Sequence, residues 1–152
     1  MRRIYLASSW RNKYHTEVYS SLINAGALVY NFKSSLAHED GGPVPTAFSW
    51  AEIDANWQNW SQSQYISKLT HSPRAQQGFM GDFRGMEWAD TCVLLMPCGR
   101  SAHIEAGYMK GRGKRLVIYY HKEEAEGFEP DLMYLLADHI VVGINGLISV
   151  LR

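Results

Sequence analysis

Short apolar runs alternate with helical patterns along most of the 152-residue chain, and this alternation constrains the fold more than any other feature. RIYLAS at residues 3–8 and TCVLLM at residues 91–96 have the length and continuous hydrophobicity of buried strands. Strands separated by helical segments are typical of βαβ units around a parallel sheet. The sequence therefore predicts an α/β protein.

The same pattern predicts five strands with helices between them. The expected strands span residues 3–8, 27–32, 91–96, 115–120 and 139–143. The expected helices cover residues 16–26, 101–111 and 130–138. With right-handed crossovers, this count gives a flavodoxin-like, doubly wound five-stranded parallel sheet flanked by helices. In such a sheet the ligand crevice lies beyond the carboxyl ends of the strands, where the strand order reverses.

Composition narrows the class of partner. Hydrophobic residues make up 46% of the chain, which is enough for the core of one globular domain. Lys plus Arg and Asp plus Glu both number 15, so no basic excess favours a nucleic acid or an anionic membrane. No apolar run approaches the roughly 18 residues of a membrane span, and the N-terminal apolar stretch is too short for a signal peptide. We expect a cytoplasmic protein with a small-molecule partner and free thiols at Cys92 and Cys98.

Residues 33–80 depart from this alternation. A polar loop rich in Gly and Pro, SSLAHEDGGPVPTAFSW, precedes a helical but weakly apolar segment. We interpret the region as a helical and loop insertion, over one end of the sheet, in a single domain that spans residues 1–152. Four large apolar side chains recur in it at helical spacing: Trp50, Ile53, Trp57 and Trp60. They indicate either a core or subunit interface or a wall on which a nucleobase stacks.

The stretch PCGRSAHIEAGY at residues 97–108 follows a predicted strand and opens a helix, so it lies where this architecture binds ligands. Ser101 is expected to be the N-cap, which puts Glu105 near the fourth helical position, one residue too far for a capping box. Gly99 leaves backbone N–H groups approachable. We interpret Glu105 either as a nucleophile or base in the crevice, or as an acidic residue that complements the helix dipole.

A second carboxylate strengthens the catalytic interpretation. Cleaving a glycosidic bond with retention takes one carboxylate to attack the anomeric carbon and another to protonate the departing group. The stretch FMGDFRGMEWAD supplies Asp82 and Asp90. Asp90 ends a predicted helix just before a strand, which favours a turn or capping role. Asp82, two turns earlier, is the candidate partner of Glu105, and a surface helix position is its alternative.

Four pieces of the chain, in order, resemble the nucleoside 2-deoxyribosyltransferase family and its nucleotide N-glycosidase relatives. They are IYLASSW, the aspartate eight residues before the AD of GMEWADTCVLLMP, GRSAHIEAGYMKGRGK and PDLMY. The resemblance covers about residues 5–135, with 33–75 unmatched. It implies that Glu105 is the nucleophile, Asp82 the acid/base that assists the nucleobase, and Tyr5 the residue that orients the nucleophile.

The resemblance also implies a double displacement without a cofactor. Glu105 attacks C1′ of the sugar and forms a glycosyl ester, which a second base or water resolves. Asp131 and Met133 match residues that the family lends from a neighbouring subunit, which implies a homo-oligomer with composite sites. The candidate substrate-binding residues are Ser8, Arg11, Gly99, Arg100, Ser101, Asp131 and Met133.

Two departures from the family pattern, at Gly99 and Asp131, leave the choice of substrate open. Gly99 stands where the transferases carry an aspartate, so both base exchange and hydrolysis remain candidates. Arg11 and Arg100 are suited to bind a 5′-phosphate. Asp131 would accept a bond from a 5′-hydroxyl but would repel a phosphate. Both the free (deoxy)nucleoside, which we favour slightly, and its 5′-monophosphate are therefore retained as substrates.

Two rival interpretations remain. Cys92, Cys98 and His103 are three residue types that bind zinc, as in nucleoside deaminases, but their order and spacing match no usual zinc pattern. The other rival is a non-catalytic nucleotide-binding module, and the joint presence of Tyr5 and the two candidate carboxylates speaks against it.

Overall fold

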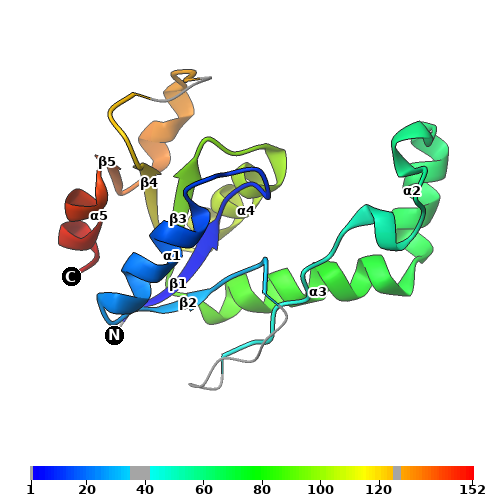
Figure 1. The fold of residues 1–152 in the computed structure, drawn as a ribbon, viewed down its shortest axis with the longest axis horizontal. Helices are drawn as coiled ribbons and strands as arrows, with labels where there is room; N and C mark the ends of the chain where they lie inside the picture. The colour runs from blue at the N-terminus through cyan, green and yellow to red at the C-terminus, as the bar shows by residue number, and fades with distance from the viewer. Residues whose placement is uncertain (1, 35–41, 125–127) are drawn as a thin grey trace. The chain divides into compact units, whose positions relative to one another are not determined.

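The computed structural model describes residues 2–34, 42–124 and 128–152. Within these residues, five parallel strands form one sheet in the order β2-β1-β3-β4-β5 (Figure 1). The strands are β1 (Arg3–Ala7), β2 (Leu28–Tyr30), β3 (Thr91–Met96), β4 (Arg115–Tyr120) and β5 (His139–Val142). The order reverses between β1 and β3, which confirms the predicted flavodoxin-like α/β sheet.

Helices and short 3-10 turns connect these strands. The α-helices are α1 (His15–Asn24), α2 (Gln62–His71), α3 (Pro73–Trp88), α4 (Arg100–Gly111) and α5 (Ile144–Leu151). The 3-10 turns are η1 (Trp50–Glu52), η2 (Trp57–Asn59) and η3 (Leu132–Leu136). Helix α1 stops where its sequence predicts, because Gly26 takes a φ of 90° just after the helix, a conformation that suits glycine.

The chain divides into two compact units, which we describe separately. The sheet unit comprises Met1–Asn31 and Met86–Arg152, and the helical unit comprises Phe32–Gly85. The sheet unit contains all five described strands with α1, α4 and α5. The predicted insertion at residues 33–80 falls inside the helical unit.

The sheet unit has a core on each face of its sheet. On one face, Ile4 and Leu6 of β1 pack with Val18 and Leu22 of α1 and with Leu147 of α5. On the other face lies α4, whose Ala102, Ala106 and Met109 are buried. The alternation of side chains along β1 sends Tyr5 to the face opposite Ile4 and Leu6. This geometry brings β1 and α4 together at the candidate site.

The last turn of α3 belongs to the sheet unit and is held there by Lys114. The Lys114 ammonium donates to the carbonyl oxygens of Met86, Glu87 and Ala89 at 2.5, 2.7 and 2.6 Å. Met86 and Glu87 lie in the last turn of α3, whose carbonyls have no partner within the helix, so a cation at the helix C-terminus stabilises them. The Tyr108 hydroxyl of α4 also donates to the Glu87 carboxylate, at 2.7 Å.

The prediction of an α-helix at residues 130–138 is wrong. Only the 3-10 turn η3 forms there, from Leu132 to Leu136. Leu132, Leu135 and Leu136 are 77%, 78% and 54% exposed, so the segment lacks the buried apolar face that stabilises most α-helices in proteins. Helix α5 was not predicted, since an eight-residue apolar run does not distinguish a helix from a strand.

The tryptophans of the helical unit do not line one helix, contrary to the sequence pattern. Asp54 separates η1 from η2, because its carboxylate accepts hydrogen bonds from the Asn56 backbone N–H and the Trp60 indole at 2.9 and 2.8 Å. Asp commonly caps a turn in this way. The Trp50 ring instead packs edge-on against Trp60 and Tyr65, at 5.8 Å in both cases. The aromatic side chains therefore form a small local cluster.

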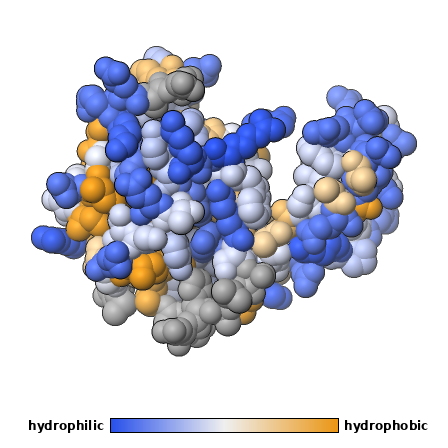
Figure 2. All heavy atoms as spheres, viewed as in Figure 1, coloured by the Kyte–Doolittle hydropathy of each residue, from blue (hydrophilic) through white to orange (hydrophobic). Residues whose placement is uncertain are grey.

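Some apolar surface of the sheet unit is uncovered. Ile140 and Val142 of β5 are 49% and 45% exposed, and Figure 2 shows hydrophobic atoms where β5 and α5 lie. In the described part of the chain, no helix combines the length and apolar character needed to cross a membrane.

Candidate active site

The centre of the candidate site is a hydrogen bond between Tyr5 and Glu105. Tyr5 lies in the middle of β1 with its ring fully buried, and its hydroxyl donates to Oε2 of the half-buried Glu105 on α4. The Tyr5 ring also stacks on Tyr30 of β2, with 5.2 Å between the ring centroids and 9° between the planes. Packing thus fixes the tyrosine, and the tyrosine in turn fixes one oxygen of the carboxylate.

Glu105 lies deeper in its helix than its sequence suggested. Helix α4 begins at Arg100, so Glu105 is its sixth residue and lies beyond the first turn. The expected N-cap, Ser101, is wrong: the N-cap is Gly99, and no side chain caps the helix. The helix starts earlier because the backbone N–H of His103 already bonds to the Gly99 carbonyl, at 3.4 Å. Interaction with the helix dipole fades after the first turn, so the dipole explanation of Glu105 loses force.

Two thiols lie close enough to Glu105 to sense its charge. Burial raises the pKa of the Cys98 thiol to about 12, and the negative charge of Glu105 contributes to this shift. The pKa of the fully buried Cys92 is raised for the same two reasons, with burial the larger. Both cysteines are free thiols. Raised pKa values keep both thiols protonated near neutral pH, which argues against a cysteine nucleophile at this site.

The loop between β3 and α4 is held by His103, which the sequence marked only as a candidate zinc ligand. The His103 Nδ1–H donates to the Gly99 carbonyl at 2.8 Å, so Nε2 accepts from the Tyr134 hydroxyl, also at 2.8 Å. The Cys98 sulfur lies 3.7 Å from Nδ1. These bonds connect η3 to the start of α4. No sequence motif links His103 with Tyr134, since the fold alone brings them together.

A buried hydrogen-bond chain anchors the ends of β1 and β2. The Ser8 hydroxyl bonds to His15 Nδ1 at 2.5 Å, and His15 Nε2–H donates to the side-chain oxygen of Asn31 at 2.8 Å. The Asn12 amide, from the same loop as Ser8, donates to the Pro97 carbonyl at 3.1 Å. The loops after β1 and β3 are therefore tied together beside Tyr5 and Glu105. His15, Asn12 and Asn31 carried no recognisable signal in the sequence.

The predicted substrate-binding residues of the sheet unit surround these loops to different degrees. Ser8 is buried, whereas Arg11, Arg100 and Ser101 are exposed. Gly99 has open space around its α-carbon: no atom lies within 4 Å of the position that a Cβ would take.

Asp131 and Met133 lie on the exposed η3 segment. Asp131 is the N-cap of η3, and its carboxylate accepts from the Met133 backbone N–H at 2.7 Å. Its carboxylate is therefore engaged in a local cap as well as being open to solvent. The Met133 side chain is 62% exposed.

Asp82 belongs to the helical unit, where it lies half-buried on α3. It is the one predicted catalytic residue outside the sheet unit, and its pairing with Glu105 remains a prediction. The zinc interpretation receives no support from geometry, since no three His, Cys, Asp or Glu side chains among the described residues are grouped to hold a metal ion.

Comparison with known proteins gives similarity at the level of structure. No protein-family model matches the sequence. No curated protein matches it either. Among solved structures, the chain resembles a 2-deoxyribosyltransferase from the psychrotolerant bacterium Bacillus psychrosaccharolyticus, with a TM-score of 0.63 and 16% identity over 96% of this chain and 90% of that one. It also resembles a CMP N-glycosidase of Clostridium botulinum, with a TM-score of 0.51 and 14% identity over 99% and 98% of the two chains.

These similarities establish the fold. The chain is an α/β protein with the flavodoxin-like architecture that its two structural neighbours share, and it matches them over nearly their whole length.

Proposed function

We propose that this protein is an enzyme of the nucleoside 2-deoxyribosyltransferase family that cleaves the N-glycosidic bond of a nucleoside or nucleotide. The observation that carries the proposal is the hydrogen bond from Tyr5 to Glu105 at the switch point of the sheet. The shared fold with a 2-deoxyribosyltransferase and a CMP N-glycosidase supports the same chemistry. The resemblance of the four sequence pieces supports the same roles for the residues.

In the first step, Glu105 attacks C1′ of the sugar. Tyr5 orients the carboxylate through Oε2, and the new bond to C1′ forms through Oε1. The C1′–N bond to the base breaks as the C1′–O ester forms, and Asp82 donates a proton to the departing base. The positive charge that develops on the sugar in the transition state is stabilised by the nearby carboxylate.

In the second step, a base or a water molecule attacks C1′ and releases Glu105, with Asp82 now acting as the base. Gly99 has no side chain to guide an acceptor base, which favours water. Ser8, Ser101, Arg11 and Arg100 supply hydroxyl and guanidinium groups for the sugar and, in a nucleotide, for the 5′-phosphate.

The proposed enzyme is a homo-oligomer in which Asp131 and Met133 serve a neighbouring subunit. The exposed leucines of η3 and the exposed apolar face of β5 support this, because monomeric proteins rarely leave such a patch uncovered. Size-exclusion chromatography with light scattering tests the oligomeric state directly.

The activity is tested by incubating the protein with deoxynucleosides, ribonucleosides and their 5′-monophosphates, with and without an acceptor base, and separating the products. New nucleosides indicate transfer, and free base with free sugar indicates hydrolysis. Inosine or uridine formed by deamination, together with stoichiometric zinc in the purified protein, would support the deaminase interpretation instead.

Glu105→Gln is the decisive variant, because the amide retains the hydrogen bond from Tyr5 but is not a nucleophile. We expect base release to fall by at least about 1,000-fold, and Asp82→Asn to reduce it by about 100-fold. Glu124→Gln changes an exposed glutamate that takes part in none of these steps and should leave turnover unchanged. Wild-type turnover in Glu105→Gln would contradict the mechanism.

A further inference from the structure

The helical unit contains a cavity of about 640 Å³ between α3 and the segment around residues 44–46. This volume is in the range of small-molecule sites. The lining residues all belong to the helical unit, whereas Tyr5 and Glu105 lie in the sheet unit. Asp82 is not among them: neighbouring residues are about 100° apart around a helix, so it projects from a different side of α3 than Gly81. None of the three candidate catalytic residues therefore lines the cavity.

One wall of the cavity is set by an unusually close approach between the backbone of α3 and the side chains of Thr46 and Phe48. A Cβ on Gly81 would lie 2.7 Å from the Thr46 side chain, and a Cβ on Gly78 would lie 2.7 Å from Cβ of Phe48. Ala47, between Thr46 and Phe48 in the sequence, has a φ of 46°, which is strained for a residue with a side chain. Strained backbone of this kind persists only when its surroundings fix it, so the wall is preformed.

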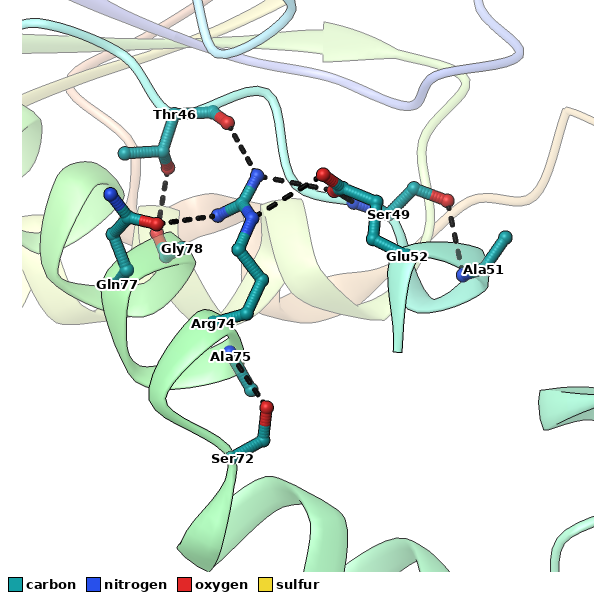
Figure 3. Close-up of polar contacts among 9 residues, drawn as sticks. All are labelled: Thr46, Ser49, Ala51, Glu52, Ser72, Arg74, Ala75, Gln77 and Gly78. Atoms are coloured by element: carbon teal, nitrogen blue, oxygen red, sulfur yellow. Dashed lines mark hydrogen bonds and ion pairs between the residues drawn. The ribbon is translucent and has the colours of Figure 1, made fainter. Parts of the chain in front are cut away.

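Arg74 fixes this wall (Figure 3). Its guanidinium donates to the Thr46 carbonyl at 2.9 Å and to the Glu52 carboxylate at 3.1 and 3.3 Å. A weaker contact at 3.4 Å joins it to the side-chain oxygen of Gln77. Glu52 balances the charge of Arg74, and the Gln77 amide nitrogen keeps its two donors for another acceptor.

Arg84 is the second arginine that lines the cavity, and unlike Arg74 it has no partner within the described ranges to balance its charge. It is exposed and forms no hydrogen bond or ion pair with any residue that the structure describes. Among the residues that the structure describes, no acidic side chain lines the cavity. The remaining walls include Pro45, Pro73 and Met80, which present flat or flexible apolar surface.

We propose that this cavity binds a small organic anion: a phosphate monoester or carboxylate carried on a flat apolar body. The anionic group pairs with Arg84 and accepts a hydrogen bond from the Gln77 amide. The apolar body lies against Pro45, Pro73 and Met80. The inference does not depend on the proposed glycosidase activity, because no candidate catalytic residue lines the cavity and the inference predicts binding alone.

Phenyl phosphate is a suitable probe, titrated into the full-length protein labelled with ¹⁵N. We expect saturable chemical-shift changes at the Gly81 amide and at the side chains of Gln77 and Arg84, with a dissociation constant of about 1 mM. Inorganic phosphate, which lacks the apolar body, should bind about tenfold more weakly. Shifts that do not saturate, that lie outside the cavity, or that are as strong with inorganic phosphate would overturn the proposal.

Two variants test the contacts. Arg84→Gln should weaken binding of phenyl phosphate at least about tenfold, and Met80→Glu, which places a carboxylate in the wall, should abolish it. Lys68→Gln removes a positive charge from α2 outside the cavity and should change the affinity less than about twofold. Glu105→Gln should bind phenyl phosphate in the cavity like the wild type, whatever its catalytic activity. Wild-type affinity in both cavity variants would contradict the site.

Discussion

Tyr5 and Glu105 are 100 residues apart in the sequence, yet the tyrosine hydroxyl donates a hydrogen bond to the glutamate carboxylate. The parallel pairing of β1 with β3 makes this possible, because α4 follows β3 directly and packs over the adjacent strand. The nucleophile proposed here is therefore oriented by an interior strand of the sheet, and such strands are among the most rigid parts of a fold of this kind.

Tyr5→Phe should lower kcat by about 100-fold with a much smaller change in KM, because the carboxylate loses the donor that fixes its orientation. The loss of one partly buried hydrogen bond should also reduce the free energy of unfolding by about 1 kcal/mol. Steady-state kinetics and urea denaturation measure the two effects.

Tyr119→Phe is the matched control for this change. Tyr119 is a buried tyrosine of β4 whose hydroxyl bonds to His121 at 2.6 Å, and its ring packs in the core with α1 and α5. We expect a similar loss of stability but unchanged kcat. Equal losses of activity in both variants would show that Tyr5 acts only through the fold.

The Cys98 thiol provides a chemical probe of the charge on Glu105. Because burial and the Glu105 charge raise its pKa to about 12, alkylation by iodoacetamide should be slow near neutral pH and rise about tenfold per pH unit up to that value. In Glu105→Gln the negative charge is gone, so the pKa of Cys98 should fall and alkylation at a given pH should become a few-fold faster. Burial is the larger cause and persists, so the rate should stay below that of an exposed thiol.

Peptide mass spectrometry resolves the two cysteines. Cys92 is fully buried in β3 and should remain unmodified throughout. An alkylation rate at Cys98 that is identical in wild type and Glu105→Gln would contradict the proximity of Glu105 to this thiol.

The sheet could be predicted from the sequence because its inner strands are nearly continuous apolar runs. TCVLLM and RLVIYY are continuous apolar runs of the length that a strand buried on both faces requires, and their positions, residues 91–96 and 115–120, agree with β3 and β4. The failed helix at 130–138 has apolar residues too, but the fold leaves them uncovered. Whether an apolar segment finds a surface to pack on is a tertiary property, which periodicity alone does not reveal.

The site was predictable only where a motif marked it. Glu105 and Tyr5 belong to recognisable stretches, and the structure brings them together. His103 with Tyr134, and Ser8 with His15, are connected by hydrogen bonds between segments whose contact depends on the loops after β1 and β3. A polar residue in a loop has no periodicity, so its partner becomes identifiable only in three dimensions.

Asp138 makes the stability of the β4–β5 edge dependent on pH. Its carboxylate accepts from the Leu116 backbone N–H at 2.8 Å and pairs with Lys110 at 2.9 Å, and both lower its pKa, the backbone bond most. A carboxyl group whose pKa is lowered by folding adds stability above its unfolded pKa of about 4, and this is lost as the pH falls through the folded value. Because the side chain is 36% exposed, solvent screening limits the contribution to about 1 kcal/mol.

Asp138→Asn should therefore be less stable than the wild type by up to about 1 kcal/mol at pH 7, and the difference should shrink as the pH falls below about 4. Urea denaturation over this pH range measures it. Added salt should weaken the ion pair between Asp138 and Lys110, but it should not weaken the hydrogen bond from the Leu116 N–H. A difference that does not change with pH would contradict the ionic origin of the effect.

Gly99→Asp tests whether the missing aspartate decides between transfer and hydrolysis. Gly99 has a φ of −94° and open space around the position of a Cβ, so an aspartate fits without strain. Because Gly99 is the N-cap of α4, the substitution should even stabilise the protein by a few tenths of a kcal/mol, roughly the usual gain at that position. The carboxylate would then stand where the transferases carry theirs, and we expect the ratio of base transfer to hydrolysis to rise at least about tenfold.

Gly99→Asn has the same size and capping ability without the charge, so it should gain stability with little change in this ratio. Equal product ratios in the two variants, measured by chromatography with a fixed acceptor base, would show that the charge at this position does not select the second substrate.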